Sequence, residues 1–215
     1  MAGTLAAVRF VLASASPARL AVLRAAGIEP SVVVSGVDED AVAAELRDPS
    51  HEDVVVALAG AKARAVAGTL PESGPSVVVG CDSMLSIGGD LVGKPGTPEI
   101  ARERWSAMAG KTGELLTGHA VLRREHGEIV AEASGTRTTV VRFGEPDDAE
   151  LDAYLATGEP LAVAGAFTLD GLGGWFVEGI DGDPSSVIGI SLPLTRELLR
   201  RVGVSVTELW TPPTS

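Results

Sequence analysis

The sequence predicts an α/β fold in which a mixed sheet is flanked by helices. Segments with helical spacing of apolar residues alternate with short valine- and leucine-rich runs, the pattern of strands connected by helices. Between residues 115 and 143, two long strand-like stretches are separated by Glu125, His126 and Gly127, which predicts a hairpin. The hairpin adds an antiparallel part to the sheet.

The composition of the chain excludes several classes to which this protein could belong. The chain has 215 residues, of which 45% are hydrophobic, and a domain usually takes about 150 residues. Its 17 basic and 29 acidic side chains give a net charge of −12, which argues against a nucleic-acid polymer as partner. The longest apolar candidate, residues 161–169, is half of the roughly 18 residues that a membrane span needs. We therefore expect no membrane partner.

Two sequence features favour a cytoplasmic location. Cys81 is the single cysteine, so an intrachain disulfide is excluded and a reducing compartment fits. Arg9 follows the first apolar stretch instead of preceding it, which is the wrong order for a secretory signal.

The first elements are a strand, a serine-rich turn and a helix. Residues 8–12 form a strand-like run, after which Ser16 suits an N-cap and Pro17 the first helical position. Gly27 fits the left-handed end of this helix. The free N–H groups at such a helix start attract anions. A second strand is expected over residues 31–35.

Residues 51–70 predict a long helix with Lys62 on its apolar stripe. Val55, Leu58, Ala59 and Val66 share that stripe at helical spacing. A lysine there either extends its ammonium to water or meets an anion, because an unpaired ammonium is costly in a dry setting. The sequence leaves both alternatives open.

The middle of the chain places two polar residues at predicted strand ends. Residues 76–80 are a valine run typical of a strand buried on both faces, and Asp82 is expected at its C-terminal edge. A short strand around residues 91–92 leads into a loop with Lys94 and a helix capped by Thr97. The inward stripe of that helix is expected to be Ala101, Trp105 and Met108.

The C-terminal third predicts two more helices around a glycine-dense segment. Residues 146–155 are expected to form a helix with Leu151, Tyr154 and Leu155 inward. Residues 158–189 are predicted to be mostly strands and turns. A last helix is expected to end at Gly203.

Several motifs of other enzyme classes are incomplete. Residues 88–94 have the glycine and lysine spacing of a P-loop, but Pro95 replaces the required Ser or Thr. Phe176 breaks a dinucleotide fingerprint begun by the glycines at 171 and 173. The three histidines have no metal-like spacing, and no nucleophile elbow is present.

Short polar clusters at element ends remain as candidates. Together they supply cations and amide donors for a polyphosphate and carboxylates for a hard metal ion. This combination suits phosphoryl chemistry. The clusters are Ser14 with Ser16 and Arg19, Asp38 with Glu39, Lys62, Asp82, Lys94, and Asp183 with Ser185.

At these clusters the sequence resembles the Maf nucleotide pyrophosphatases, also described as septum formation inhibitor Maf-like proteins. The resemblance runs from about residue 8 to residue 203, in matching order and spacing. It is carried by the segments 12–19, 38–39, 58–63, 80–83, 93–95, 164–167 and 182–189.

The resemblance implies a fold and a reaction. The fold would be Maf/ITPase-like, with two lobes and a central cleft, in one domain over residues 1–210 followed by a frayed end at 211–215. The family hydrolyses nucleoside triphosphates to monophosphate and pyrophosphate with a divalent cation, Mg²⁺, and its members are often homodimers. These activities remove unwanted nucleotides from the cellular pool.

Roles for individual residues follow from the same resemblance. Asp82 would be the catalytic carboxylate that activates water, and Glu39 its catalytic partner; both would be near the metal. The triphosphate would be bound by Ser14, Ser16, Arg19, Lys62 and Lys94. The positive charges of Arg19, Lys62 and Lys94 would offset the charge that develops on the departing pyrophosphate.

The sequence departs from the family at several positions. Ala18 stands where a second arginine is common, and Gly113 ends a stretch that usually ends in histidine; Cys81 and Ser83 replace commoner small residues. Asp170 occupies a position where the branch acting on thymidine and uridine triphosphates commonly has glutamine. An ionised aspartate only accepts hydrogen bonds, as from the N–H groups of guanine. The segment 170–173 also resembles the branch acting on 7-methylguanosine triphosphate, which has an acidic residue there. Both points favour a purine or modified base.

The alternative hypothesis is a non-catalytic nucleotide-binding regulator of cell division. Maf proteins are also associated with arrest of septum formation, and this chain lacks two family residues. A simple phosphatase is disfavoured because the sequence contains no nucleophile motif or dinuclear metal cluster.

Overall fold

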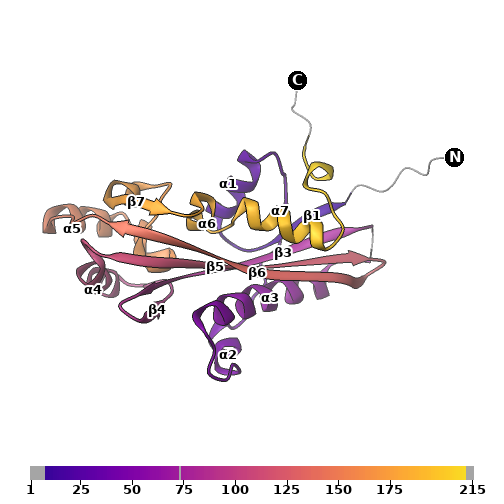
Figure 1. The fold of residues 1–215 in the computed structure, drawn as a ribbon, viewed down its shortest axis with the longest axis horizontal. Helices are drawn as coiled ribbons and strands as arrows, with labels where there is room; N and C mark the ends of the chain where they lie inside the picture. The colour runs from indigo at the N-terminus through magenta and orange to yellow at the C-terminus, as the bar shows by residue number, and fades with distance from the viewer. Residues whose placement is uncertain (1–7, 73, 212–215) are drawn as a thin grey trace. The chain divides into compact units, whose positions relative to one another are not determined.

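The computed structural model describes residues 8–72 and 74–211. The chain divides into two compact units: residues 1–82, 118–136 and 192–215 form the first, and residues 83–117 and 137–191 the second. Within the described ranges, seven strands form one sheet in the order β2-β1-β3-β5-β6-β7, with β4 paired to β3 (Figure 1). The strands are β1 (Arg9–Ala13), β2 (Ser31–Val32), β3 (Ser76–Ile87), β4 (Asp90–Val92), β5 (Thr112–Glu125), β6 (Glu128–Phe143) and β7 (Val177–Asp181).

The sheet is mixed, as predicted. β1 pairs in parallel with both β2 and β3, whereas β4 is antiparallel to β3 and β7 to β6. The turn between β5 and β6 falls at His126 and Gly127, where the sequence predicts the hairpin. The prediction of an α/β fold is confirmed.

In the first unit, helices cover both faces of the strands. Its helices within the described ranges are α1 (Pro17–Ala25), α2 (Glu39–Ala44), α3 (His51–Thr69), α7 (Leu192–Arg201) and the 3-10 turn η4 (Val206–Glu208). α3 and α7 lie on opposite faces (Figure 1). The α3 side is filled mainly by alanine and valine, with one leucine: Val11, Ala13, Ala59, Ala63, Val66, Ala67, Val78, Ala120 and Leu122.

Local sequence signals set the helix starts. The Ser16 side chain accepts from the Arg19 N–H, and Pro17 follows as the first helical residue. α3 begins with a capping box in which Ser50 and Asp53 bond each other's backbone. The predicted helix 51–70 is therefore confirmed to within one residue.

The second unit is built on an aromatic core. Its helices within the described ranges are α4 (Pro98–Met108), α5 (Asp148–Ala156), η1 (Glu159–Ala162), η2 (Ala164–Ala166), η3 (Leu172–Phe176) and α6 (Pro184–Ile188). Trp105 contacts Phe143, Tyr154 and Phe176 edge-on, with ring centroids 5.8–6.2 Å apart. Its indole Nε1 donates to the Ala166 carbonyl at 2.8 Å. The predicted inward stripes of α4 and α5 are buried.

Asp82 does not lie at the end of its strand, contrary to the prediction. β1 ends at Ala13, opposite Gly80, but β3 continues for seven residues beyond Gly80, to Ile87, because Leu85 and its neighbours pair with β4. The strand predicted over residues 31–35 is also shorter, ending at Val32.

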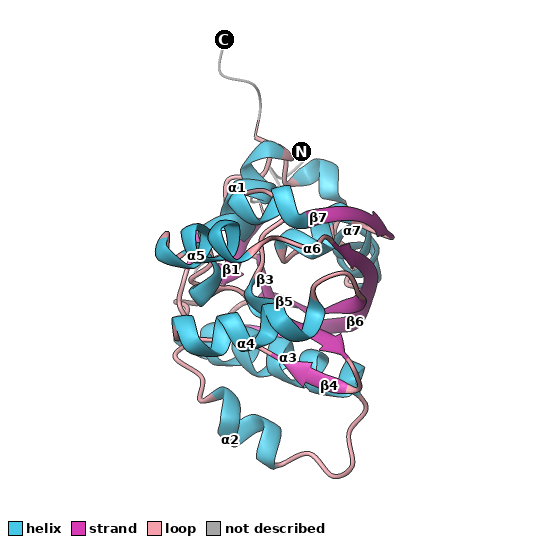
Figure 2. Cartoon of the chain, turned by 90° about the vertical axis from the view of Figure 1, so that its left-hand side faces the viewer, coloured by secondary structure: helices cyan, strands magenta, loops and turns pink. Residues whose placement is uncertain are grey.

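Two further predictions differ from the structure. Residues 39–44 form α2, which the sequence analysis did not predict; Asp38 caps it by accepting from the Ala41 N–H at 3.0 Å. Two loops join α2 to the rest of the first unit (Figure 2). Residues 158–189 contain short helical turns more than strands, because Gly158 and Gly165 adopt positive φ and repeatedly turn the chain.

The incomplete P-loop is a hairpin turn. Ile87 pairs with Asp90, so Gly88 and Gly89 are the two turn residues, both at positive φ. No helix follows them directly. Rejection of the P-loop is confirmed.

The predicted single domain over residues 1–210 stays a prediction. Of the end predicted to fray, the Thr211 N–H donates to the Gly27 carbonyl at 2.7 Å, and residues 212–215 lie outside the described ranges.

Candidate active site

The first unit brings together Lys62, Asp82 and Glu39. The Lys62 Nζ lies 2.6 Å from Asp82 Oδ1 and 2.7 Å from Glu39 Oε1. The Lys62 and Asp82 side chains are 11% and 9% exposed, whereas Glu39 is 49% exposed. Lys62 thus meets anions instead of reaching for water, which decides between the two alternatives left open by the sequence.

Gly80 explains how Lys62 reaches Asp82. A Cβ on Gly80 would lie 2.2 Å from the Ala59 carbonyl oxygen and 2.9 Å from the Ala63 nitrogen. Only glycine allows α3 to approach β3 this closely. Because side chains alternate along a strand, Gly80 and Asp82 share the face that α3 covers. Gly118 of β5 has the same role farther along, since its Cβ would meet the Val55 carbonyl oxygen at 2.2 Å.

The turn after β1 holds a second cluster. The Ser14 hydroxyl oxygen accepts from Arg19 Nη1 at 3.1 Å and from the Ser16 N–H at 3.1 Å. Ser14 is buried, and Arg19 and Ser16 are half-buried. One hydroxyl therefore fixes the Arg19 guanidinium beside the start of α1. Anions favour such a place because both the guanidinium and the backbone N–H groups are donors.

Charged residues of both clusters act on the buried thiol of Cys81. Burial raises the pKa of its thiol to about 11, with Asp82 acting in the same direction and the charges of Arg19 and Lys62 opposing it. Since Arg19, Lys62 and Asp82 all act on this thiol, the serine-rich turn and the ion pair share one electrostatic environment. The thiol itself is inert at neutral pH.

Glu39 and Asp82 are the carboxylates here that could contribute to a divalent cation site. Among the described residues, no group of three or more His, Cys, Asp or Glu side chains could hold a metal alone. Glu39 and Asp82 instead place two carboxylates around one positive charge, that of Lys62. Mg²⁺ commonly takes one or two protein carboxylates and completes its shell with phosphates and water.

Lys94 and Asp170 belong to the second unit, so the structure does not place them relative to the Lys62 cluster. Both are exposed. The loop of Lys94 is held to η1 and η2, because the Gly96 N–H donates to the Leu161 carbonyl and the Gly165 N–H to the Gly93 carbonyl.

Two carboxylates of the second unit are surrounded by donors. Burial opposes ionisation of Glu159, but hydrogen bonds from Thr168, Gly173, Leu172 and Tyr154 hold its pKa below the usual value. Asp183 is similar. Burial disfavours its charge, yet bonds from two serine hydroxyls and two backbone N–H groups lower its pKa. Those hydroxyls belong to Ser185 and Ser191.

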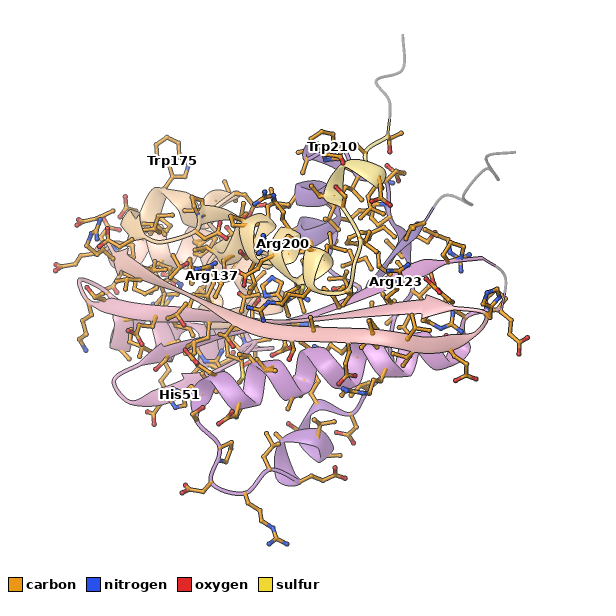
Figure 3. The ribbon with its side chains drawn as sticks, turned by 45° about the vertical axis from the view of Figure 1, so that its right-hand side comes forward. His51, Arg123, Arg137, Trp175, Arg200 and Trp210 are labelled. Atoms are coloured by element: carbon orange, nitrogen blue, oxygen red, sulfur yellow. The ribbon has the colours of Figure 1, made fainter. Side chains whose placement is uncertain are left out.

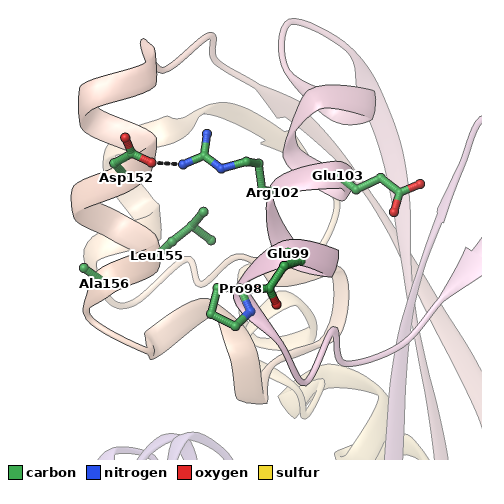
Figure 4. A pocket seen from close by; sticks show the side chains of 7 residues that line it. All are labelled: Pro98, Glu99, Arg102, Glu103, Asp152, Leu155 and Ala156. Carbon is green, nitrogen blue, oxygen red and sulfur yellow. Dashed lines mark ion pairs between the residues drawn. The ribbon is translucent and has the colours of Figure 1, made fainter.

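A groove of about 540 Å³ lies between α4 and α5 (Figure 4). Arg102 and Asp152 form an ion pair across it, and Pro98 and Leu155 contribute apolar surface. It contains none of the residues predicted to act in the site.

Glu159 and the anchoring of the Lys94 loop were not predicted from the sequence. Glu159 is in a short 3-10 turn, and its partners come 9 to 14 residues later in an irregular segment. Periodicity carries no signal for such contacts. The tight glycines at 171 and 173 were the available clue.

The fold is a mixed sheet flanked by helices, and a close contact between α3 and β3 brings Lys62 to Asp82, with Glu39 beside them. These features define the class of this protein. The chain belongs to the Maf-like protein family, whose sequence model matches residues 9–202. Among the described residues, no helix has both the length and the apolar character needed to cross a membrane.

Several proteins with high sequence identity to this chain have the same name. Proteins named nucleoside triphosphate pyrophosphatase occur in Saccharopolyspora erythraea, 67% identical over 207 residues, and in Rhodococcus jostii, 66% identical over 204 residues. The matches cover 95% and 94% of this chain and 98% and 95% of those proteins. A protein of the same name from Nocardia farcinica is 65% identical over 205 residues, covering 94% of this chain and 97% of its own.

Proposed function

We propose that this protein is a nucleoside triphosphate pyrophosphatase that removes unwanted or modified nucleotides from the cellular pool. The name shared by relatives at 65–67% identity over nearly the whole chain supports the activity. The structural observation that carries the proposal is the buried Lys62–Asp82 ion pair with Glu39 beside it.

The proposed reaction is a single displacement by water. The water oxygen bonds to the α-phosphorus, and the bond from that phosphorus to the bridging oxygen breaks. Nucleoside monophosphate and pyrophosphate leave, and the proton of the water passes to Asp82 and then to solvent. Such a reaction depends on positioning and charge stabilisation more than on covalent chemistry.

The residues take roles that match their surroundings. Asp82 aligns the water, and Lys62 fixes the Asp82 carboxylate through the 2.6 Å contact. Ser14, Ser16 and Arg19 supply donors for the phosphates, as does Lys94 from the second unit.

Glu39 and Asp82 would hold a divalent cation, which we propose to be Mg²⁺. When bound, it supplies positive charge that offsets the charge of the phosphates. Lys62 contacts both carboxylates, so it keeps them facing one point. Titration of the protein with Mg²⁺ by calorimetry should show weak binding that Glu39→Gln reduces, with Asp40→Asn as the matched control on the same helix.

Base recognition is assigned to Asp170. Its carboxylate is exposed, and within the described residues no group donates a hydrogen bond to it. An ionised carboxylate accepts from the N–H groups of guanine, so we propose a purine or modified base such as 7-methylguanine. Asp170→Gln should shift preference towards pyrimidines. If preference is unchanged, Asp170 does not select the base.

We further propose a cytoplasmic homodimer. The single, buried cysteine is compatible with a reducing compartment, and the resemblance to the Maf family suggests the dimer. Sedimentation of the purified protein should give twice the mass of 21.9 kDa.

The decisive experiment measures products. With Mg²⁺ and a panel of ordinary and methylated nucleoside triphosphates, the protein should release pyrophosphate and monophosphate. Release of single phosphate would reject this reaction type. Saturable calorimetric binding without product under any metal would favour the alternative, a nucleotide-binding regulator of cell division.

A further inference from the structure

Glu159 receives hydrogen bonds from the segment that carries Asp170. Its Oε1 accepts from the Thr168 hydroxyl and from the Gly173 N–H at 3.0 Å, and its Oε2 accepts from the Leu172 N–H at 3.1 Å. These donors lie on both sides of Asp170 in the sequence. One carboxylate therefore closes residues 168–173 into a loop.

We infer that Glu159 is a positioning residue that holds this loop, here called the 168–173 loop, and so sets base selection by Asp170. The inference rests on the proposed function, in which Asp170 contacts the base. Glu159 acts through the loop and does not itself contact the base.

The loop is shaped for this carboxylate. A Cβ on Gly171 would lie 2.8 Å from both Glu159 carboxylate oxygens, and a Cβ on Gly173 would lie 2.4 Å from the Tyr154 hydroxyl. Side chains at these two positions would push the backbone N–H groups away from Glu159. The glycines are required by close approach.

Glu159 is anchored to the aromatic core of the second unit. Tyr154 donates its hydroxyl to Glu159 Oε1 at 3.3 Å, and its ring packs against Trp105 and Phe176 with centroids 6.2 and 5.6 Å away. Tyr154 is 3% exposed. Tyr154 thus fixes the Glu159 carboxylate from the side of the core, and the carboxylate holds the 168–173 loop on its other side.

The position needs a carboxylate, not an amide. Two hydroxyls and two backbone N–H groups all donate, and a carboxylate offers two oxygens that only accept. Glutamine would turn an NH₂ group towards a donor. It would keep the size of the side chain but leave one N–H of the loop unsatisfied.

The first test does not depend on activity. In Glu159→Gln, hydrogen exchange at the Leu172 and Gly173 amides should accelerate about tenfold, the scale of one lost hydrogen bond, while amides of α3 stay unchanged. Glu103→Gln, an exposed change on α4, is the matched control. Unchanged protection of both amides would overturn the inference, and so would a general loss of protection that includes α3.

The second test measures selection. The ratio of kcat/KM between the preferred and the poorest nucleoside triphosphate should fall about tenfold in Glu159→Gln, mainly through KM. In an Asp170→Asn background the same change should alter the ratio less than about twofold, because the two residues act through one loop. Equal effects in both backgrounds would contradict the inference.

The two hypotheses fail differently. If the wild-type protein releases no pyrophosphate, the proposed function is wrong, and selection is then measured as the ratio of calorimetric Kd values for the same triphosphates. A Kd ratio that Glu159→Gln leaves unchanged would overturn the positioning role.

Discussion

The ammonium of Lys62 and the carboxylate of Asp82 form a buried ion pair with 2.6 Å between Nζ and Oδ1. Lys62 comes from α3 and Asp82 from β3, twenty residues apart. Burying either charge alone would be costly, so each residue depends on the other. The pair links the packing of the first unit to the chemistry proposed for it.

Asp82→Asn should abolish most activity while the protein stays folded. The amide keeps an oxygen that accepts from Lys62, but it cannot take a proton from water. Pyrophosphate release should fall about 100- to 10,000-fold. Asp90→Asn, an exposed change on β4, is the control. An Asp82→Asn protein with wild-type turnover would exclude Asp82 as the base.

Lys62→Met should lower the free energy of unfolding by about 3–5 kcal/mol, because it leaves the buried Asp82 carboxylate without its cation. Urea denaturation measures the change. The double variant Lys62→Met with Asp82→Leu should recover most of this loss, since both charges are then removed. If the double variant is as unstable as the sum of the single changes, the pair is not coupled.

Gly80→Ala should destabilise the first unit by about 3 kcal/mol. The added methyl group would overlap the Ala59 carbonyl and force α3 away from β3. Gly68→Ala on α3 is the matched control, because none of the described atoms lies within 4 Å of a Cβ there. That control should be neutral or slightly stabilising. Thermal unfolding of both variants compares them directly.

The carboxylate of Asp183 should make stability depend on acid. Its pKa is lowered in the folded protein, so its stabilising contribution is complete above the unfolded pKa of about 3.9 and is lost as the pH falls through the lower folded value. Unfolding by urea at a series of pH values from neutral to acidic should show this loss. Asp183→Asn should be less stable at neutral pH and should show a weaker acid dependence. Parallel curves for the two proteins would contradict the assignment.

Cys81 should resist alkylation in the folded protein. Its thiol is buried, and its pKa is raised to about 11, so little thiolate forms at pH 7. Mass spectrometry after iodoacetamide treatment should find modification only when urea is added. Rapid labelling without denaturant would show that the strand around Cys81 opens.

Much of the first unit could be predicted because its signals are local and periodic. Ser16 followed by Pro17 marked the start of α1, and the apolar spacing around Lys62 marked the inward face of α3. Because Lys62 lies on that face, the sequence predicts that its ammonium either extends to water or meets an anion, and the ion pair with Asp82 shows the second. The sequence could not choose the partner, because the pairing depends on how closely α3 approaches β3.

The remaining differences arise from contacts distant in sequence. β3 extends beyond Gly80 because β4 returns to pair with it, and a valine run carries no sign of that pairing. Asp38 was identified as part of a polar cluster, but its role as a helix cap depends on one backbone N–H three residues on. The role of Glu159 could not be predicted from the sequence, because its partners lie in an irregular loop.

Trp175 lies on η3, two residues after Gly173, which is bonded to Glu159, and its side chain projects from the surface with 86% exposure (Figure 3). Of the other two tryptophans, Trp105 is fully buried and Trp210 is 55% exposed. The indoles of Trp175 and Trp105 should differ in emission wavelength and in quenching by acrylamide. The native chain therefore carries an optical reporter beside the proposed base-recognition loop, so nucleotide binding there can be followed by fluorescence without attaching a dye.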